Sequence, residues 1–231
     1  MWYDEFVRRF IATFITADLY RQFVDGFRNT LFITACATVI GCVVGAAVAI
    51  AKVYCAQTGR LKWLDSVCNV YLTVIRGTPI VLQLLIMYFV VFPRYSALLA
   101  AVLTFGINSG AYMAEIMRAG IMAIDIGQTE AARTLGLSAA ASMRFIILPQ
   151  AIKNILPAVG NEFIALLKET SVVGYITVVD LTRAGNLVRA RTLDPYFSLF
   201  FVAGVYLLLV IGITSLLKKL ERRLRRSDRG A

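Results

Sequence analysis

Residues 130–149, EAARTLGLSAAASMRFIILP, form a polar island in a chain whose other long segments are mostly apolar. We expect two short helices here, because Gly136 is a good helix stop and Ser138 is a good N-cap for a second helix. The second helix is expected to stop at Pro149, which lacks the backbone donor that a helix interior needs. The spacing alone does not distinguish this island from an ordinary loop with two helical turns.

The first helix of the island has features suited to docking against another protein. Asp125 and Gln128 are spaced as a loose capping pair, and Glu130 falls in the first turn, where a carboxylate is favoured. Ala131 and Ala132 are small, and their exposure would allow close docking in a groove. We therefore interpret the island as an element that projects from the rest of the chain and receives force from another protein.

The rest of the chain has the composition of a membrane protein. Of its 231 residues, 59% are hydrophobic, whereas soluble domains contain about 45–50% apolar residues. Charged residues make up 16%, yet the net charge is +10. In such an apolar chain this excess indicates Lys and Arg on the cytoplasmic side of a membrane, and no nucleic-acid partner is expected.

The sequence predicts no metal site and no cofactor. The chain has no histidine, which excludes histidine-based acid–base catalysis. Its cysteines show no Cys-x-x-Cys pair, so we interpret them as small residues packed between helices rather than as metal ligands. These cysteines are Cys36, Cys42, Cys55 and Cys68.

Five segments are expected to cross a membrane, because about 20 mostly apolar residues span the ~30 Å hydrocarbon core. These crossings are predicted at residues 29–51, 66–92, 95–117, 151–170 and 195–217. Basic residues follow the first and the last crossing, which indicates that both of these ends lie in the cytoplasm. The expected fold is all-α and polytopic, with the N-terminus outside and the C-terminus inside. Its expected parts are an N-terminal interfacial segment (1–28), a five-helix transmembrane domain (29–217) with the island in a loop at about 119–149, and a basic cytoplasmic tail (218–231).

Two segments outside the crossings are open to alternative interpretations. Residues 1–28 are neutral overall and rich in aromatic side chains, which indicates either a helix lying in the membrane interface or a frayed amphipathic terminus. Residues 176–194 form a polar segment on the outer side. Its basic residues would attract the acidic face of a docking protein, or would belong to a solvated loop: Arg183, Arg189 and Arg191.

Small residues and a helix break mark the first two crossings. Gly41 and Gly45 form a GxxxG pair, which lets another helix approach closely. The second crossing contains the run Gly77-Thr78-Pro79, and Pro79 leaves the carbonyl of Ile75 without its helical donor. Broken backbone at membrane depth is tolerated only where protein or water covers it.

Polar side chains mark the third and fourth crossings. The fourth contains Glu162 and Glu169, which are seven residues apart and therefore share a face, about 10 Å apart along the axis. This segment is too polar to face lipid, so we expect it to lie inside an assembly with its acids toward a cavity or a partner. Four residues share one face of the third crossing: Thr104, Asn108, Ala111 and Glu115.

Structural roles for the acids remain open alternatives. Glu162 would pair with Arg76 of the second crossing. Glu169 would pair with Lys168 of another subunit or face outside water. Glu115 lies nearer the cytoplasm, where we expect it to pair with a base such as Arg118 at the i, i+3 spacing.

These motifs resemble a known family. The markers of the island have the spacing of the EAA signature in permease subunits of bacterial ATP-binding-cassette importers: Glu130-Ala131-Ala132, Gly136, Ile146 and Leu148-Pro149. Within that family, further runs resemble the permeases for polar amino acids such as glutamine, arginine or histidine: Ile75-Arg76-Gly77-Thr78-Pro79, Asn108-Ser109-Gly110-Ala111-Tyr112, Glu115-Ile116-Met117-Arg118-Ala119-Gly120 and Gly160-Asn161-Glu162-Phe163. The resemblance covers nearly the whole chain.

The resemblance implies that the island is a coupling helix, which docks in a cleft of a cytoplasmic ATPase. Its coupling residues would be Glu130, Ala131, Ala132 and Gly136. The resemblance also implies a place in the bacterial plasma membrane, a second permease subunit that is an identical copy or a paralogue, and an external solute-binding protein. The chain has no GxxxxGK[ST] phosphate-binding loop, so we expect no ATP hydrolysis in this polypeptide.

The resemblance also implies a set of solute-binding residues in the middle of the membrane. They are Gly77, Ile80, Thr104, Asn108, Glu162, Ala165 and Glu169. The residue types suit this role, because the break exposes backbone groups, Thr and Asn supply neutral hydrogen bonds, and the two acids can hold the α-ammonium or a cationic side chain of an amino acid.

Two other functions remain open at this point. An importer for another small solute, such as an opine or a phosphonate, would carry the same EAA signature. A channel or an ion-coupled carrier that needs no ATPase would also be compatible with the acidic fourth crossing, although such a protein would have no use for a docking helix.

Overall fold

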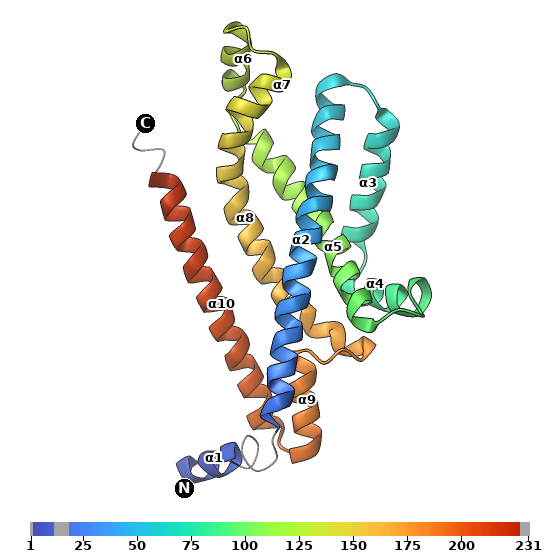
Figure 1. Cartoon of the computed structure of the whole chain (residues 1–231), viewed down its shortest axis with the longest axis vertical. Helices are drawn as coiled ribbons and strands as arrows, with labels where there is room; N and C mark the ends of the chain where they lie inside the picture. Colours follow the sequence, from blue (N-terminus) through green and yellow to red (C-terminus); the bar gives the residue numbers. More distant parts are fainter. Residues whose placement is uncertain (1, 12–18, 227–231) are drawn as a thin grey trace.

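The structure, a computed structural model, describes residues 2–11 and 19–226. The regular elements in these ranges are all helical, as the sequence predicted. Figure 1 shows an elongated bundle with α6, α7 and the turn between α2 and α3 at one end, and with α1 and α9 at the other. The elements are α1 (Trp2–Ile11), α2 (Tyr20–Thr58), α3 (Lys62–Gly77), α4 (Ile80–Ile86), the π-helical η2 (Met87–Val91), α5 (Ala97–Met122), α6 (Ile126–Thr134), α7 (Ala139–Ser142), the π-helical η3 (Met143–Ile147), α8 (Leu148–Glu169), the 3-10 helix η4 (Thr170–Ile176), α9 (Leu181–Thr192) and α10 (Pro195–Arg226).

Among the described residues, three helices are long and apolar enough to cross a membrane: Tyr20–Thr58, Ala97–Met122 and Pro195–Arg223. A fourth crossing is present if α3 and the α4–η2 segment count as one, but they are bent by 106° at their junction. The second expected crossing is therefore sharply broken rather than straight. The first is longer than expected, because α2 begins at Tyr20 rather than at residue 29. The α8 helix lies where the fourth crossing was expected. Its polar and charged residues make it less apolar than the three helices named above.

The long helices α2 and α5 pack directly against each other, with the GxxxG pair at their contact. A Cβ placed on Gly41 would lie 2.9 Å from the Oγ of Ser109. A Cβ on Gly45 would lie 2.5 Å from the Cβ of Met113 and 2.9 Å from the backbone nitrogen of Ala114. Only glycine leaves room for this approach, which confirms the prediction that these small residues bring another helix close.

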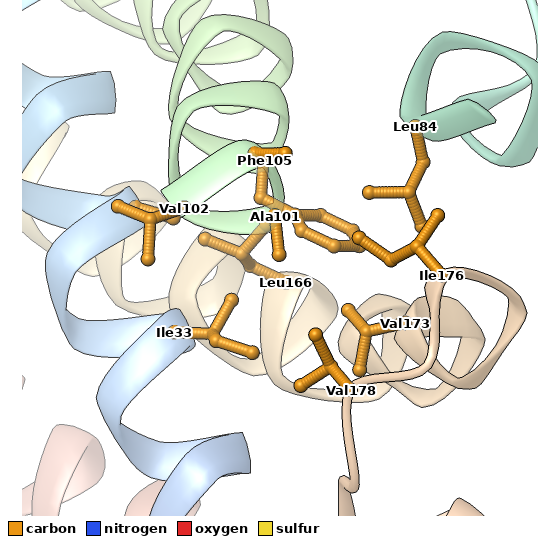
Figure 2. Close-up of a cluster of buried hydrophobic side chains, with 11 residues drawn as sticks. Ile33, Leu84, Ala101, Val102, Phe105, Leu166, Val173, Ile176 and Val178 are labelled. Carbon is orange, nitrogen blue, oxygen red and sulfur yellow. The ribbon is translucent and has the colours of Figure 1, made fainter. Parts of the chain in front are cut away.

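An apolar cluster fixes the bent segment α4 in place (Figure 2). It brings together fully buried side chains from separate helices, including Ile33 of α2, Leu84 of α4, Phe105 of α5 and Leu166 of α8. Val173 of η4 completes the cluster. Because α4 packs against both α5 and η4, it is held against the bundle although its axis turns away from that of α3.

The island folds as two helices, as predicted. Gly136 has a φ of +86°, and the N–H groups of Gly136 and Leu137 donate to the carbonyls of Arg133 and Ala132 at 3.0 and 3.1 Å. This pair of bonds is a Schellman motif, which requires a residue that tolerates positive φ and therefore explains the glycine. The hydroxyl of Ser138 caps the next helix.

The second helix of the island does not stop at Pro149, contrary to the prediction. The helix continues from α7 through η3 into α8, and Pro149 lies in the first turn of α8. In the wide turn of η3, the N–H of Leu148 donates to the carbonyl of Met143. Such a π-helical turn accommodates a residue without a donor, so the island is continuous with α8.

The polar segment 176–194 contains a packed helix rather than a solvated loop. The carboxylate of Asp180 caps α9 by accepting from the backbone N–H groups of Thr182 at 2.8 Å and Arg183 at 3.0 Å. Asp180 is fully buried, and Gly26 lets the start of α2 lie against its carbonyl. The basic side chains expected here are exposed on α9: Arg183, Arg189 and Arg191.

The N-terminal segment forms the helix α1, which lies across the end of the bundle beside the start of α10 (Figure 1). The ring centroids of Phe6 and Phe10 lie 5.7 and 6.4 Å from that of Phe197. Arg9 forms an ion pair with Asp194 at 2.7 Å. These contacts attach α1 to α10 and favour a helix in the interface over a frayed terminus. Residues 12–18 of the same segment lie outside the described ranges.

We predict that Gly45→Ala destabilises the protein, because its Cβ would clash with Met113. Overpacking of this kind costs about 1–3 kcal/mol, whereas Ala is otherwise favoured over Gly in a helix by about 1 kcal/mol. The matched control is Gly212→Ala on α10, where a Cβ has no neighbour within 4 Å. Thermal unfolding in mild detergent should give a lower midpoint for Gly45→Ala than for the control. Equal midpoints would contradict a close α2–α5 contact.

Candidate functional site

The candidate site is built around the break between α3 and α4. Thr78 and Pro79 are extended, with ψ values of 144° and 135°, so carbonyls at the end of α3 lose their helical donors. The hydroxyl of Thr78 donates to the carbonyl of Val74 at 2.8 Å. The side-chain amide of Gln83 donates to the carbonyl of Ile75 at 2.7 Å and to that of Thr78 at 3.1 Å. Side chains therefore satisfy the carbonyls of Val74, Ile75 and Thr78, including the carbonyl of Ile75 that Pro79 leaves without a donor.

The α5 helix contributes Thr104 and Asn108, both buried. The amide nitrogen of Asn108 donates to Oε1 of Gln83 at 3.0 Å, so this predicted solute residue is joined to the break. The hydroxyl of Thr104 donates to the carbonyl of Ala100 in its own helix at 2.7 Å. The oxygen of that hydroxyl can still accept a further hydrogen bond.

The α8 helix contributes Glu162, whose carboxylate accepts a hydrogen bond from the hydroxyl of Ser109 at 3.2 Å. Ser109 directly follows Asn108 on α5. Of these two neighbouring residues of α5, Asn108 therefore contacts the broken segment and Ser109 contacts α8. This arrangement brings three of the predicted elements together: the break, the polar face of α5 and the acids of α8.

The alternative that Glu162 pairs with Arg76 is wrong. Arg76 lies 3.9 Å from the carboxylate of Glu115 instead, and its guanidinium lies 5.4 Å from the ring centroid of Tyr112. Glu115 also accepts two hydrogen bonds from Arg118, at 3.2 and 3.0 Å. These bonds confirm the predicted i, i+3 pair, and the resulting cluster explains why Arg76 does not reach α8.

The remaining predicted solute residues lie on the same three segments. Gly77 is exposed, and a Cβ placed on it would have no neighbour within 4 Å. Ile80 is half-buried against the apolar cluster. Ala165 and Glu169 are half-buried on α8. Of these four, Glu169 lies close enough to Glu162 for the two carboxylates to interact electrostatically. The grouping of the whole set around a solute stays a prediction.

Two polar residues of the site, Gln83 and Ser109, were not predicted from the sequence. Gln83 is the only amide in the apolar run 80–92, and it follows Pro79 by one helical turn. That position was an available signal, because one turn after a proline is where a side chain can reach back to the freed carbonyl. Ser109 carried no comparable signal, since nothing local marks it as the partner of Glu162.

The exposed end of the island has the character of a docking surface. Glu130 and Ala131 are exposed on α6, but Ala132 is buried, so the expected exposure of both alanines is wrong for Ala132. The carbonyl of Ala132 accepts a hydrogen bond from Leu137 in the Schellman turn, and α6 packs against η3 here, which buries Ala132. Ile126 and Leu135 are 73% and 84% exposed at the tip. Large exposed apolar side chains on a projecting element are typical of a protein contact surface.

A family model described as "binding-protein-dependent transport system inner membrane component" matches residues 47–226. The matched range includes the break, α5, the island and α8. A solved structure titled "Crystal structure of an amino acid ABC transporter with histidines" is also similar, with a TM-score of 0.83 and 41% identity over 90% of this chain and 96% of that chain.

Curated relatives are similar over most of both sequences. The putative glutamine transport system permease protein GlnP of Rickettsia felis is 37% identical over 87% of this chain and 92% of its own length. The arginine transport system permease protein ArtQ of Bacillus subtilis is 38% identical over 89% of this chain and 93% of its own length. GlnP of Escherichia coli is 36% identical over 87% and 92%, respectively.

These similarities cover the helices that form the candidate site as well as the island. In such systems the permease is the membrane component, and ATP hydrolysis belongs to a separate subunit. The chain is therefore a multi-pass protein of the bacterial inner membrane. It belongs to the inner-membrane permease components of binding-protein-dependent ATP-binding-cassette importers, in the group of polar amino acid permeases.

Proposed function

We propose that this permease forms the translocation path for a polar or charged L-amino acid, which an external solute-binding protein delivers and a separate ATPase drives. The relatives named for glutamine and arginine support this solute class. One observation carries the proposal: Asn108 contacts Gln83 at 3.0 Å while the adjacent Ser109 contacts Glu162 at 3.2 Å. Polar groups from three segments thus converge inside an otherwise apolar bundle, as a pathway for a polar solute requires.

The proposed solute contacts surround this convergence. The open backbone at Gly77 and the amide of Asn108 supply neutral hydrogen bonds. Glu162 and Glu169 supply negative charge for the α-ammonium and for a cationic side chain. The full proposed set is Gly77, Ile80, Thr104, Asn108, Glu162, Ala165 and Glu169.

The proposed topology has five crossings, with the N-terminus outside and the C-terminus inside. The α8 helix supplies the additional crossing, because it runs from the island along α2 and α10 toward the other end of the bundle (Figure 1). Its polar residues are tolerated where protein rather than lipid covers them. The helices and turns at the island end carry basic residues, so the positive-inside rule assigns this end to the cytoplasm: Lys52, Arg60, Lys62, Arg118, Arg133 and Arg144.

A second permease subunit, identical or paralogous, is proposed to complete the path, because one chain leaves the break at Gly77 exposed.

The ATPase pair closes on ATP and opens after hydrolysis, and α6 is proposed to follow that movement. Gly120 of α5 and Ile155 of α8 are in close contact near the island, since a Cβ on Gly120 would lie 2.3 Å from the Ile155 side chain. Movement of α6 would therefore displace α5 and α8 together and change which face reaches the site.

The direct test is uptake by vesicles that contain the permease, its ATPase and its solute-binding protein. We expect ATP-dependent uptake of at least one of radiolabelled L-glutamine, L-arginine and L-histidine. Uptake that ignores ATP, with no ATPase subunit co-purifying in mild detergent, would instead indicate a channel or an ion-coupled carrier. ATP-dependent uptake of an opine or a phosphonate without any amino acid would overturn the proposed solute class.

Gly136→Val is predicted to weaken ATPase docking without unfolding the membrane part, because a φ of +86° is unfavourable for any residue with a Cβ and costs about 1–2 kcal/mol. Glu130→Lys should also weaken docking, by reversing a charge on the exposed face of α6. The matched control is Gly59→Val, which places the same strain at a φ of +65° in the α2–α3 turn. Recovery of the ATPase in a mild-detergent pull-down measures docking, and unchanged recovery in both island variants would remove the coupling role.

Glu162→Gln is predicted to reduce uptake of L-arginine more than uptake of L-glutamine, because it removes a charge and keeps an acceptor for Ser109. Hydrogen bonds to charged groups are worth about 1.5–3 kcal/mol, so the arginine-to-glutamine uptake ratio should fall by about tenfold or more. Glu221→Gln, near the basic end of α10, is the control for loss of a carboxylate elsewhere. An equal loss for both solutes would show that Glu162 is structural.

A further inference from the structure

We propose that Gln83 is a positioning residue of the solute site, which orients the amide of Asn108 so that its carbonyl oxygen faces the solute. The inference rests on the proposed function and adds a residue to it. Gln83 lies outside the set of solute contacts expected from the sequence, and its role follows from the contacts at the break.

The side chain of Gln83 uses both of its polar atoms. Its Nε2 donates to the carbonyl of Ile75 at 2.7 Å, to the hydroxyl of Thr78 at 2.8 Å and to the carbonyl of Thr78 at 3.1 Å. Its Oε1 accepts from Asn108 at 3.0 Å. These contacts engage the donor hydrogens of the amide nitrogen and one of the two acceptor lone pairs of the oxygen.

These contacts fix the orientation of two amides in succession. Backbone carbonyls only accept hydrogen bonds, so Gln83 must present its nitrogen to Ile75 and Thr78, and its oxygen then points toward Asn108. Asn108 must in turn present its nitrogen to Gln83. The Oδ1 of Asn108 is therefore the atom left to accept a hydrogen bond from a solute, and an α-ammonium is the matching donor on an amino acid.

The break depends on the same side chain. The α3 and α4–η2 segments meet at 106°, and the α4–η2 segment spans only Ile80–Val91, so it is too short to be stable through its own backbone bonds alone. Loss of the Gln83 amide would leave the carbonyls of Ile75 and Thr78 without these donors in an apolar bundle. A solute that binds Asn108 and shifts its side chain would therefore also shift Gln83, and with it the hydrogen bonds that hold the break.

The first test replaces Gln83 by methionine, which keeps the length of the side chain and removes its hydrogen bonds. In vesicles with ATPase and binding protein, the maximal ATP-dependent uptake of L-glutamine and L-arginine should fall about tenfold, the factor expected for one or two lost hydrogen bonds. The binding-protein concentration for half-maximal uptake should stay within about twofold, because that protein docks elsewhere. A purely structural residue would instead lower the amount of folded permease and leave the uptake per folded molecule unchanged.

The matched control is Tyr71→Phe, which removes a hydrogen bond of 2.6 Å from α3 to the carbonyl of Ile107 on α5. This bond also reaches α5 from the broken segment, but from α3 rather than from α4, and it does not involve Gln83 or Asn108. Uptake by Tyr71→Phe should remain within about twofold of the unmodified permease. An equal loss in Tyr71→Phe and Gln83→Met would overturn the specific role of Gln83.

The second test uses Asn108→Asp, which remains informative even where Gln83→Met does not fold. A carboxylate would attract an α-ammonium more strongly than an amide, but it cannot donate to Oε1 of Gln83. The inference expects a loss of about tenfold in uptake, and a loss in the double variant with Gln83→Met that is clearly smaller than the product of the two single losses, because both changes remove the Gln83–Asn108 contact. Unchanged or increased uptake by Asn108→Asp, or independent losses that multiply, would overturn it.

The uptake measurements distinguish failure of the proposed function from failure of the role assigned to Gln83. Absence of ATP-dependent amino acid uptake by the unmodified permease would overturn the proposed function and this inference with it. Normal uptake by the unmodified permease together with normal uptake by Gln83→Met would overturn the inference alone.

Discussion

The close packing of α2 on α5 is the constraint on which the rest of the structure depends. Gly41 and Gly45 let the two helices approach until a Cβ would be 2.9 and 2.5 Å from the facing side chains. This contact fixes the position and rotation of α5. Because Asn108 and Ser109 occupy successive positions on α5, a fixed rotation is what allows one to reach the break and the other to reach Glu162. The polar site therefore depends on the close α2–α5 contact, which places its central helix.

The island lies where a force can reach both sides of that site. It connects α5 to α8 in the chain, and the two helices also touch near it, at Gly120 and Ile155. The π-helical turn before Pro149 keeps the island continuous with α8, so a displacement of α6 need not be absorbed by a flexible joint. At the other end of the bundle, α9 packs on α2 and α10, and Arg9 of α1 pairs with Asp194 beside the start of α10.

Local spacing predicted the features that depend on residues close in the sequence: the glycine stop and serine cap of the island, the GxxxG contact and the Glu115–Arg118 pair. Features that depend on distant partners could not be predicted this way. Gln83 meets Asn108 across 25 residues, and Ser109 meets Glu162 across 53. The alternative that Arg76 pairs with Glu162 is wrong, because the fold places Arg76 beside Glu115 instead. The error at Pro149 has another cause, since a proline ends a regular helix but is tolerated beside a π-helical turn.

The central claim is that ATP changes which side of the membrane reaches the break at Gly77. The most direct measurement labels the thiol introduced by Gly77→Cys, at an exposed position with room for a Cβ, after Cys36, Cys42, Cys55 and Cys68 have been replaced. A membrane-impermeant maleimide is applied from either side of vesicles that contain the permease and its ATPase. The account predicts labelling from the island side without nucleotide and from the opposite side with a non-hydrolysable ATP analogue. Labelling from one side only, whatever the nucleotide, would contradict it.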